Sequence, residues 1–248
     1  MEGRRAVIEL LAAGRRRVER LWLADGLESS AQLDEIEALA ARRKVPVETV
    51  SRGRLAAAAG TEAPQGVVAV ARPIEETPLG DLCEAAGPGA PPFLLVVAGV
   101  TDPHNLGALL RSAECAGVTG VVLPRHRSAN LSPTVAKVAA GAIEHLAFSL
   151  VGGIPAALGQ IAGFGVRTVG LAGEARRSLY ELDLGGSPVA LVVGSEERGL
   201  PQLARRRCDD LVSIPQQGSI SSLNVAAAGA VACFEVARQR AGASGGRA

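Results

Sequence analysis

The sequence predicts an α/β protein in which helices cover both faces of a parallel β-sheet. Two observations favour this fold class. Short and nearly continuous apolar runs, such as residues 93–99 and 189–194, alternate with stretches of helical periodicity. In addition, hydrophobic residues make up 48% of the 248 residues, which is enough to fill a large core. The chain is therefore expected to fold as one large domain or two modest ones.

The first 72 residues are expected to form a small α/β domain. Strand-like runs lie at "VERLWLA" (18–24), "VPVETV" (45–50) and "GVVAVAR" (66–72). Helical patterns lie around residues 4–13 and 30–43. This domain, residues 1–72, ends where proline and glycine become frequent.

Residues 73–91 are rich in Pro, Gly and acidic side chains, which interrupt any sustained period and predict a linker. The second domain is expected over residues 92–240. Its strand-like runs lie at 93–99, 120–124, 145–150, 166–172, 189–194 and 211–215, with helical stretches between most of them. The last eight residues, "AGASGGRA" (241–248), have the composition of a disordered tail.

The composition argues against several classes of protein. No stretch reaches about 18 uninterrupted apolar residues, and the arginine-rich start is unlike a signal peptide, so we expect a cytoplasmic protein that is not bound to a membrane. The four cysteines and three histidines are scattered and form no C-x-x-C pair. Reduced thiols and a mechanism without a metal ion follow as expectations.

The net charge of +1 does not by itself indicate a nucleic-acid-binding protein. The basic residues are nearly all arginines, however, and they cluster at 15–17, 42–44 and 205–207. Arginine clusters suit contacts with phosphate groups, but ordinary solvated faces would account for them equally well.

Three polar loops are expected to follow strands of the second domain. "TDPHNLGALLRSAECAG" follows the run at 93–99, "GSEERG" follows the run at 189–194, and "PQQGSISSLN" follows the short strand at 211–214. In open parallel sheets, ligands bind beyond the carboxyl ends of the strands. The three loops together are therefore the candidate site.

In the first loop, Asp102 and Pro103 predict the start of a helix, with the aspartate as cap and proline in the first turn. Asn105 and Arg111 lie six residues apart on this helix and so do not stack on one face. Spacing alone leaves Arg111 as either a site residue or an ordinary surface arginine. "GSEERG" lacks the Lys-Ser/Thr of a P-loop, and its adjacent glutamates would repel a polyphosphate. A site for a nucleoside without phosphates is the better interpretation.

The segments "DPHNLGALLRSAECAG", "LVVGSEERGL" and "IPQQGSISSLNVAAAGAVACFEVAR" resemble, in order and spacing, three motifs of the SpoU/TrmH family. This is a family of RNA ribose 2′-O-methyltransferases in the SPOUT superfamily. The small first domain, ending in "PQGVVAVAR", looks like the substrate-binding domain of the branch that methylates a guanosine of 23S ribosomal RNA. The resemblance covers nearly the whole chain.

The resemblance implies that the second domain carries a deep trefoil knot and encloses S-adenosylmethionine. By the same resemblance, Gly194, Ile214 and Leu223 contact this cofactor through their backbone, while Ser222 and Asn224 shape the loop and the catalytic pocket. The small residues 226–230 would let their helix pack closely against neighbours, across a homodimer. RNA, as free 23S rRNA or an assembly intermediate, is the expected partner.

The implied reaction is in-line transfer of the sulfonium methyl group to a ribose 2′-hydroxyl. That hydroxyl is a poor nucleophile with a high pKa, so it must be oriented and its proton handled. The family motif assigns this work to Arg111, helped by Asn105, with Glu196 fixing the arginine or the cofactor pocket. Because a guanidinium stays protonated in proteins, we expect Arg111 to act electrostatically, with an RNA phosphate or water accepting the proton.

Two alternatives remain. One is a transfer-RNA or antibiotic-resistance rRNA 2′-O-methyltransferase of the same family. The other is an RNA-binding ribosome-assembly factor without catalytic turnover, against which the presence of Asn105, Arg111, Glu196, Ser222 and Asn224 argues.

Overall fold

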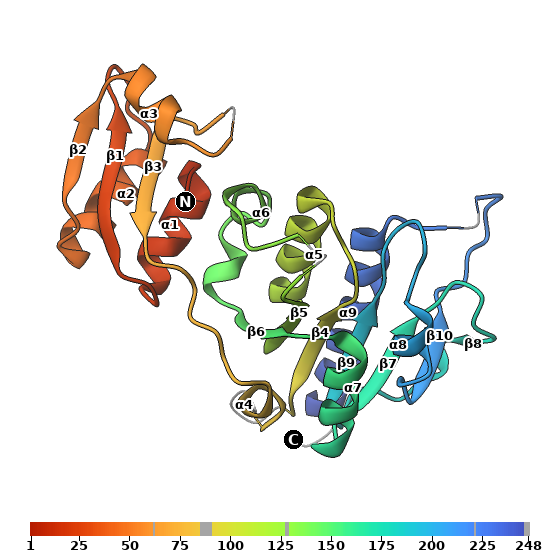
Figure 1. Ribbon diagram of the computed structural model, residues 1–248. Helices are drawn as coiled ribbons and strands as arrows, with labels where there is room; N and C mark the ends of the chain where they lie inside the picture. The colour runs from red at the N-terminus through yellow and green to blue at the C-terminus, as the bar shows by residue number, and fades with distance from the viewer. Residues whose placement is uncertain (62, 85–90, 127–128, 221, 246–248) are drawn as a thin grey trace. The chain divides into compact units, whose positions relative to one another are not determined.

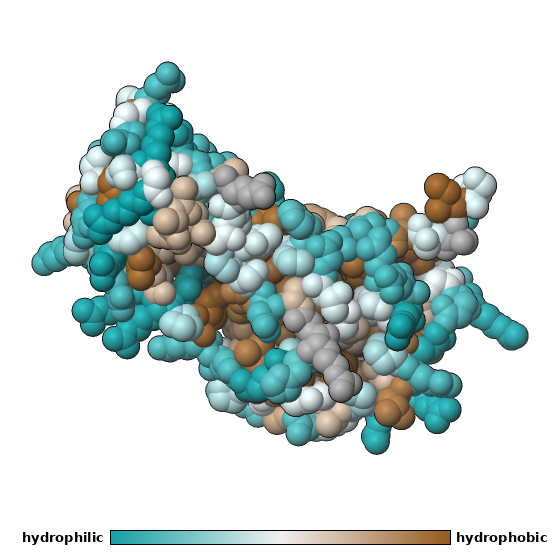
Figure 2. Space-filling model, turned by 45° about the horizontal axis from the view of Figure 1, so that its top comes forward, coloured by the Kyte–Doolittle hydropathy of each residue, from teal (hydrophilic) through white to brown (hydrophobic). Residues whose placement is uncertain are grey.

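The computed structural model describes residues 1–61, 63–84, 91–126, 129–220 and 222–245 (Figure 1). The chain divides into two compact units. The small unit comprises Met1–Glu75 together with Asn130–His145, and the large unit comprises Glu76–Ala129 together with Leu146–Ala248. On the side seen in Figure 2, the surface is mostly hydrophilic with scattered hydrophobic residues.

Within the described residues, the small unit contains a three-stranded sheet in the order β2-β1-β3. Its strands are β1 (Val18–Ala24), β2 (Val47–Val50) and β3 (Val67–Ala71). Strand β1 pairs in parallel with β2 and antiparallel with β3. The helices are α1 (Arg4–Ala13), α2 (Ala31–Arg43) and α3 (Arg52–Ala58). The predicted strands and the first two helices are confirmed; α3 is additional.

The small unit also includes a segment from the middle of the chain. Helix α6 (Pro133–Val138) and the 3-10 helix η1 (Ala142–Glu144) pack against α1. The buried Glu144 carboxylate accepts a hydrogen bond of 3.0 Å from Arg16 Nε, and the two residues also form an ion pair. Sequence alone groups residues 130–145 with the second domain, because nothing local in the sequence reveals a contact between residues 128 positions apart.

In the part of the chain that the structure describes, the large unit holds a seven-stranded sheet in the order β6-β5-β4-β9-β7-β10-β8. The strands are β4 (Phe93–Val97), β5 (Gly120–Pro124), β6 (Ala147–Val151), β7 (Arg167–Leu171), β8 (Arg177–Ser178), β9 (Val189–Val193) and β10 (Asp210–Ser213). All neighbouring strands are parallel. The predicted parallel sheet is confirmed.

Helices cover both faces of this sheet. They are α4 (Leu79–Glu84), α5 (Pro103–Cys115), α7 (Ile154–Gly163), α8 (Gln202–Arg205) and α9 (Val225–Gly245), with the 3-10 helix η2 (Leu179–Glu181). Val192 packs in a core cluster with residues of α4, α7 and α8, whereas the adjacent Val193 lies close to Gly229 of α9. Since successive strand residues point to opposite faces, α9 and its neighbour α5 cover the face opposite α7 (Figure 1).

Two segments differ from the expectations. Helix α4 forms inside residues 73–91, because Leu82 and Cys83 reach the core of the large unit and are buried there; residues 85–90 lie outside the described residues. Helix α9 continues to Gly245, so residues 241–245 are helical, while 246–248 lie outside the described residues. None of the described helices is long and apolar enough to cross a membrane. The trefoil knot stays a prediction.

Candidate active site

Loops that follow four neighbouring strands meet at the carboxyl edge of the large sheet. Strands β4, β9, β7 and β10 are adjacent and parallel, so the residues after them lie at one edge. A cavity of about 160 Å³ opens there. It is lined by Leu171, Ala172, Gly173, Val193, Gly194, Ser195, Glu196, Gly199, Val212, Ile214, Gln216, Ser222, Leu223, Val225 and Ala228.

This cavity brings together five of the residues singled out from the sequence: Gly194, Glu196, Ile214, Ser222 and Leu223. Sequence reasoning missed the segment 171–173, which follows β7 and forms another wall. The signal for it exists in the sequence, because 166–172 reads as a strand of the same parallel sheet and its carboxyl end belongs at the same edge.

A second cavity, of about 190 Å³, lies beside the first and shares Ser195, Glu196 and Val225 with it. The loop after β4 forms its other wall, with residues 99–102 and Asn105. The loop between β9 and α8 therefore separates two adjoining hollows. One hollow can hold a cofactor while the other receives the group on which it acts.

Asn105, Glu196 and Asn224 form a hydrogen-bonded cluster at this shared wall. Asn105 Nδ2 donates to Glu196 Oε2 at 2.8 Å. Asn224 Nδ2 donates to Glu196 Oε1 at 3.2 Å and to Asn105 Oδ1 at 2.9 Å. The two amides thus supply donors to both oxygens of one carboxylate, which holds one residue from each of the three loops in place.

Asn224 also caps α9. Its Oδ1 accepts hydrogen bonds from the backbone N–H groups of Ala226 and Ala227, at 2.9 and 3.3 Å. These N–H groups have no partner within the first helical turn, so the cap stabilises the helix start. One amide side chain therefore caps the helix with its oxygen and reaches across the site with its nitrogen.

The start of α5 is held in a similar way. Asp102 caps the helix by accepting a hydrogen bond of 3.0 Å from the His104 backbone N–H, and Pro103 occupies the first turn. The predicted helix start is confirmed. The cap places Asn105 in the first turn, where its side chain lies beside Glu196.

The loop after β9 requires glycine at its first position. Ser195 and Gly199 exchange two backbone hydrogen bonds, of 3.0 and 2.9 Å, which close a tight turn. A Cβ atom at Gly194 would lie 2.1 Å from the carbonyl carbon of Gly199 and 2.3 Å from the backbone nitrogen of Leu200. Because these are backbone atoms, they cannot move aside as a flexible side chain would. Gly194 thus lets the turn close while its backbone faces the first cavity.

The structure also places Arg111 and Ala228. Arg111 is exposed on α5 and lines neither cavity of its own chain. Ala228, one of the small residues 226–230 of α9, lines the first cavity. The exposed positions of α9 include Ala227, Val231 and Phe234. These follow the i, i+4, i+7 spacing of one helix face.

The first cavity is lined by backbone groups, apolar and short polar side chains and the Glu196 carboxylate, which it shares with the second cavity; Asp102 and Glu197 also line the second cavity. Among the described residues, no cluster of three His, Cys, Asp or Glu side chains could hold a metal ion. The buried Cys233 of α9 is not a nucleophile at neutral pH, because burial raises the pKa of its thiol to about 12. The negative Glu196 beside an otherwise uncharged cavity favours a cationic or hydroxyl-rich ligand.

Comparison with protein families gives two matches. Residues 92–234 match the SpoU rRNA methylase family, and residues 1–77 match the RNA 2′-O ribose methyltransferase substrate-binding domain. A curated relative from Pseudomonas putida, named 23S rRNA (guanosine-2′-O-)-methyltransferase RlmB, is 43% identical over 240 residues, which is 96% of this chain and 95% of the relative. A relative of the same name from Shewanella oneidensis is 41% identical and covers 96% of both chains.

Solved structures share the fold. A structure named RNA 2′-O ribose methyltransferase is 29% identical, with a TM-score of 0.78 over 97% of this chain and 88% of that one. The SpoU methyltransferase AviRb from Streptomyces viridochromogenes, in complex with AdoMet, is 22% identical, with a TM-score of 0.81 over 98% of this chain and 90% of that one. At that identity, the second likeness concerns the fold alone.

Proposed function

The chain belongs to the SpoU rRNA methylase family of RNA 2′-O-methyltransferases, and we propose that it methylates the ribose 2′-hydroxyl of a guanosine in 23S rRNA. The observation that carries this proposal is the cluster of Asn105, Glu196 and Asn224, which joins the three loops between two adjoining cavities. The names of the relatives from Pseudomonas putida and Shewanella oneidensis support 23S rRNA as the substrate.

We infer that the first cavity is part of the binding site of S-adenosylmethionine, the cofactor of the family. The backbone around Gly194, Ile214 and Leu223 offers N–H and C=O groups for the adenosine part, and a side chain at position 194 would fill the space needed for the turn. The Glu196 carboxylate complements a positively charged sulfonium. When bound, this cofactor supplies a methyl group that is activated for nucleophilic attack.

The chain itself has to position the ribose and manage its proton. Asn105 and Glu196 line the second cavity and can hold the 2′-hydroxyl by hydrogen bonds. Asn224 holds the loop before α9 by capping the helix, and Ser222 lines the first cavity. Arg111 would stabilise the negative charge that develops on the oxygen, while an RNA phosphate or water accepts the proton, because a guanidinium does not act as a base.

We further propose that the protein works as a symmetric homodimer. Val231 and Phe234 are large apolar side chains of α9 that are 37% and 50% exposed, which leaves an apolar stripe to be covered. In a two-fold dimer the same stripe meets itself. Since Arg111 lines neither cavity of its own chain, a shared site would let it serve the cavity of the partner.

Mapping of 2′-O-methylated nucleotides in rRNA from cells with and without the gene tests the substrate. The proposal predicts the loss of one 2′-O-methylguanosine from 23S rRNA and its return when the wild-type gene is restored. Loss of a methyl group from transfer RNA instead would mean that the protein is a transfer-RNA 2′-O-methyltransferase of the same family. An unchanged methylation map, combined with defective ribosome assembly, would favour an RNA-binding factor without turnover.

A further inference from the structure

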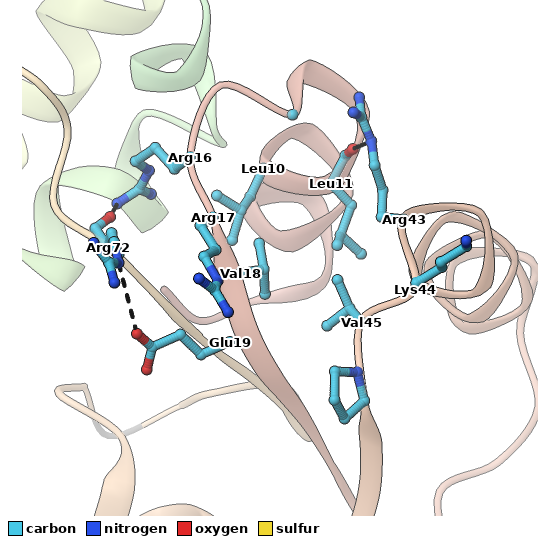
Figure 3. A pocket seen from close by; sticks show the side chains of 12 residues that line it. Leu10, Leu11, Arg16, Arg17, Val18, Glu19, Arg43, Lys44, Val45 and Arg72 are labelled. Carbon is cyan, nitrogen blue, oxygen red and sulfur yellow. Dashed lines mark hydrogen bonds and ion pairs between the residues drawn. The ribbon is translucent and has the colours of Figure 1, made fainter.

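A cavity of about 550 Å³ lies in the small unit, apart from the residues of the candidate active site. It is formed by the end of α1, the turn before β1, the end of α2 and the residue that follows β3 (Figure 3). Its lining residues are Leu10, Leu11, Gly14, Arg16, Arg17, Val18, Glu19, Arg43, Lys44, Val45, Pro46 and Arg72. The volume falls in the range of about 300–1,000 Å³ that is usual for ligand sites.

The floor of this cavity is aliphatic. Leu10 and Leu11 are fully buried in the core of the small unit, and the partly buried Val18 and Val45 pack against the same core. Figure 3 shows these four side chains gathered between Arg17 and Arg43. Leu10 and Leu11 expose almost no surface, so a ligand would meet the apolar side chains of Val18 and Val45.

Two of the surrounding cations are fixed in position. Arg43 donates hydrogen bonds to the carbonyl oxygens of Leu11 and Ala12, at 3.1 and 2.9 Å, and so satisfies the end of α1. Arg16 donates to the Arg72 carbonyl oxygen at 2.9 Å and pairs with Glu144. The positive charge of Arg16 is therefore neutralised by Glu144. Arg43 keeps its positive charge, because carbonyl oxygens carry no net charge.

Arg17 and Lys44 are exposed and lie on opposite sides of the floor (Figure 3). In the portion of the chain that the structure describes, neither of them forms an ion pair. Glu19 is the acid among the lining residues, and its carboxylate lies 3.9 Å from Arg72 Nε. The rim thus keeps a surplus of positive charge around an apolar floor.

We propose that this cavity binds one nucleotide of single-stranded RNA, with its phosphate at Arg17 and Lys44 and its base or ribose against the aliphatic floor. This inference rests on the proposed function, because the substrate there is RNA. A nucleotide carries both features that the cavity complements, an anionic phosphate and a broad face of low polarity. An inorganic anion has no apolar face and would make no contact with the aliphatic floor.

The test compares two double variants of the full chain with the same change in charge. Arg17→Gln with Lys44→Gln alters the cavity, whereas Arg20→Gln with Arg42→Gln alters two exposed arginines nearby that do not line it. The full chain is used because residues 130–145 belong to the same unit as the first 75 residues. Thermal unfolding of both variants checks that the fold is intact.

Affinity for a 23S rRNA transcript is measured at several salt concentrations. The cavity variant should bind the transcript about tenfold to a hundredfold more weakly, and its logarithmic salt slope should be smaller by about 0.7 for each phosphate group that it no longer neutralises. The control variant should change the affinity by less than threefold. Equal weakening in the two variants would overturn the proposal.

Inorganic polyphosphate serves as a second probe, because it repeats the charge of RNA without base or ribose. The substitutions in the cavity should weaken RNA binding more than polyphosphate binding; equal weakening would contradict a nucleotide site. Methyl transfer at saturating RNA should match the wild type, since the cavity affects KM and not kcat. A wild-type protein that transfers no methyl group would refute the proposed function, while the affinities would still decide the role of the cavity.

Discussion

Asn224 Nδ2 donates a hydrogen bond of 2.9 Å to Asn105 Oδ1, although 119 residues separate the two in the chain. The bond joins the start of α9 to the start of α5, and both amides also donate to Glu196. Three loops that are distant in sequence are thereby held in one arrangement. Substitutions within this cluster can separate its contribution to folding from its contribution to catalysis.

Asn224→Ala should lower both stability and activity. The substitution removes the cap of α9, which costs about 1 kcal/mol in the free energy of unfolding. Asn224→Ser separates the two effects, because a serine hydroxyl can cap the helix but is too short to reach Asn105 and Glu196. Denaturant unfolding should return nearly to wild type in the serine variant, while methyl transfer stays low. Full activity in the serine variant would mean that the cap alone matters.

Glu196→Gln should reduce methyl transfer with little effect on folding. The substituted side chain keeps its shape but offers one acceptor oxygen where the carboxylate offers two, so one of the two asparagine donors loses its partner. Glu84→Gln is the matched control, because Glu84 is exposed on α4 and lines neither cavity. Steady-state kinetics of both variants, with S-adenosylmethionine affinity from calorimetry, checks the expectation. Similar activity in the two variants would remove Glu196 from the site.

Gly194→Ala should disrupt the turn that borders the first cavity. The added methyl group would meet backbone atoms of Gly199 and Leu200, and relief of that overlap costs about 1–3 kcal/mol. Gly218→Ala is the control, since a Cβ atom there meets nothing within 4 Å. Calorimetry should show weakened S-adenosylmethionine binding for the first variant and unchanged binding for the second. Unchanged binding in both would argue against a cofactor at this turn.

Arg111→Ala should lower methyl transfer by about two to four powers of ten, the range for a positioned group that handles a proton. Folding and cofactor binding should stay near wild type, because the side chain is exposed and lines neither cavity. Single-turnover rates and calorimetry measure the two effects. A rate within threefold of wild type would leave Arg111 as an ordinary surface arginine.

Mixing of Arg111→Ala and Asn224→Ala chains tests whether the site is shared between subunits. If Arg111 serves the partner, some mixed dimers regain one intact site, and activity should return to about a quarter of wild type after random pairing. Subunit exchange is verified with chains of different tags. Exchange without recovery would assign each Arg111 to its own chain.

Apart from the two-residue strand β8, the strands of both units and the three loops could be predicted, because their signals are local. Short apolar runs such as 93–99 and 189–194 identify buried parallel strands, and loops at their carboxyl ends belong to one edge of the sheet. The helix start at Asp102 can likewise be predicted, because the capping aspartate and Pro103 are adjacent in the sequence. Each of these features can be predicted from a short stretch of the sequence.

Other features depend on contacts that no local pattern reveals. The pairing of Arg16 with Glu144 draws residues 130–145 into the small unit. The position of Ala228 in the cavity wall follows from the rotation of α9, which its nearly uniform small residues do not specify. Helix α4 forms in a proline- and glycine-rich segment because Leu82 finds a core to enter. In each case, packing between residues that are distant in the sequence determines the local structure.

The most direct test of the proposed activity follows a labelled methyl group from S-adenosylmethionine into 23S rRNA with the purified protein. The RNA is then hydrolysed in alkali, which cannot cleave the backbone next to a 2′-O-methylated ribose. We expect label in an alkali-stable dinucleotide whose first residue is 2′-O-methylguanosine, and much less label with the Glu196→Gln protein. Label in an alkali-labile product, or on a base, would contradict methyl transfer to the ribose.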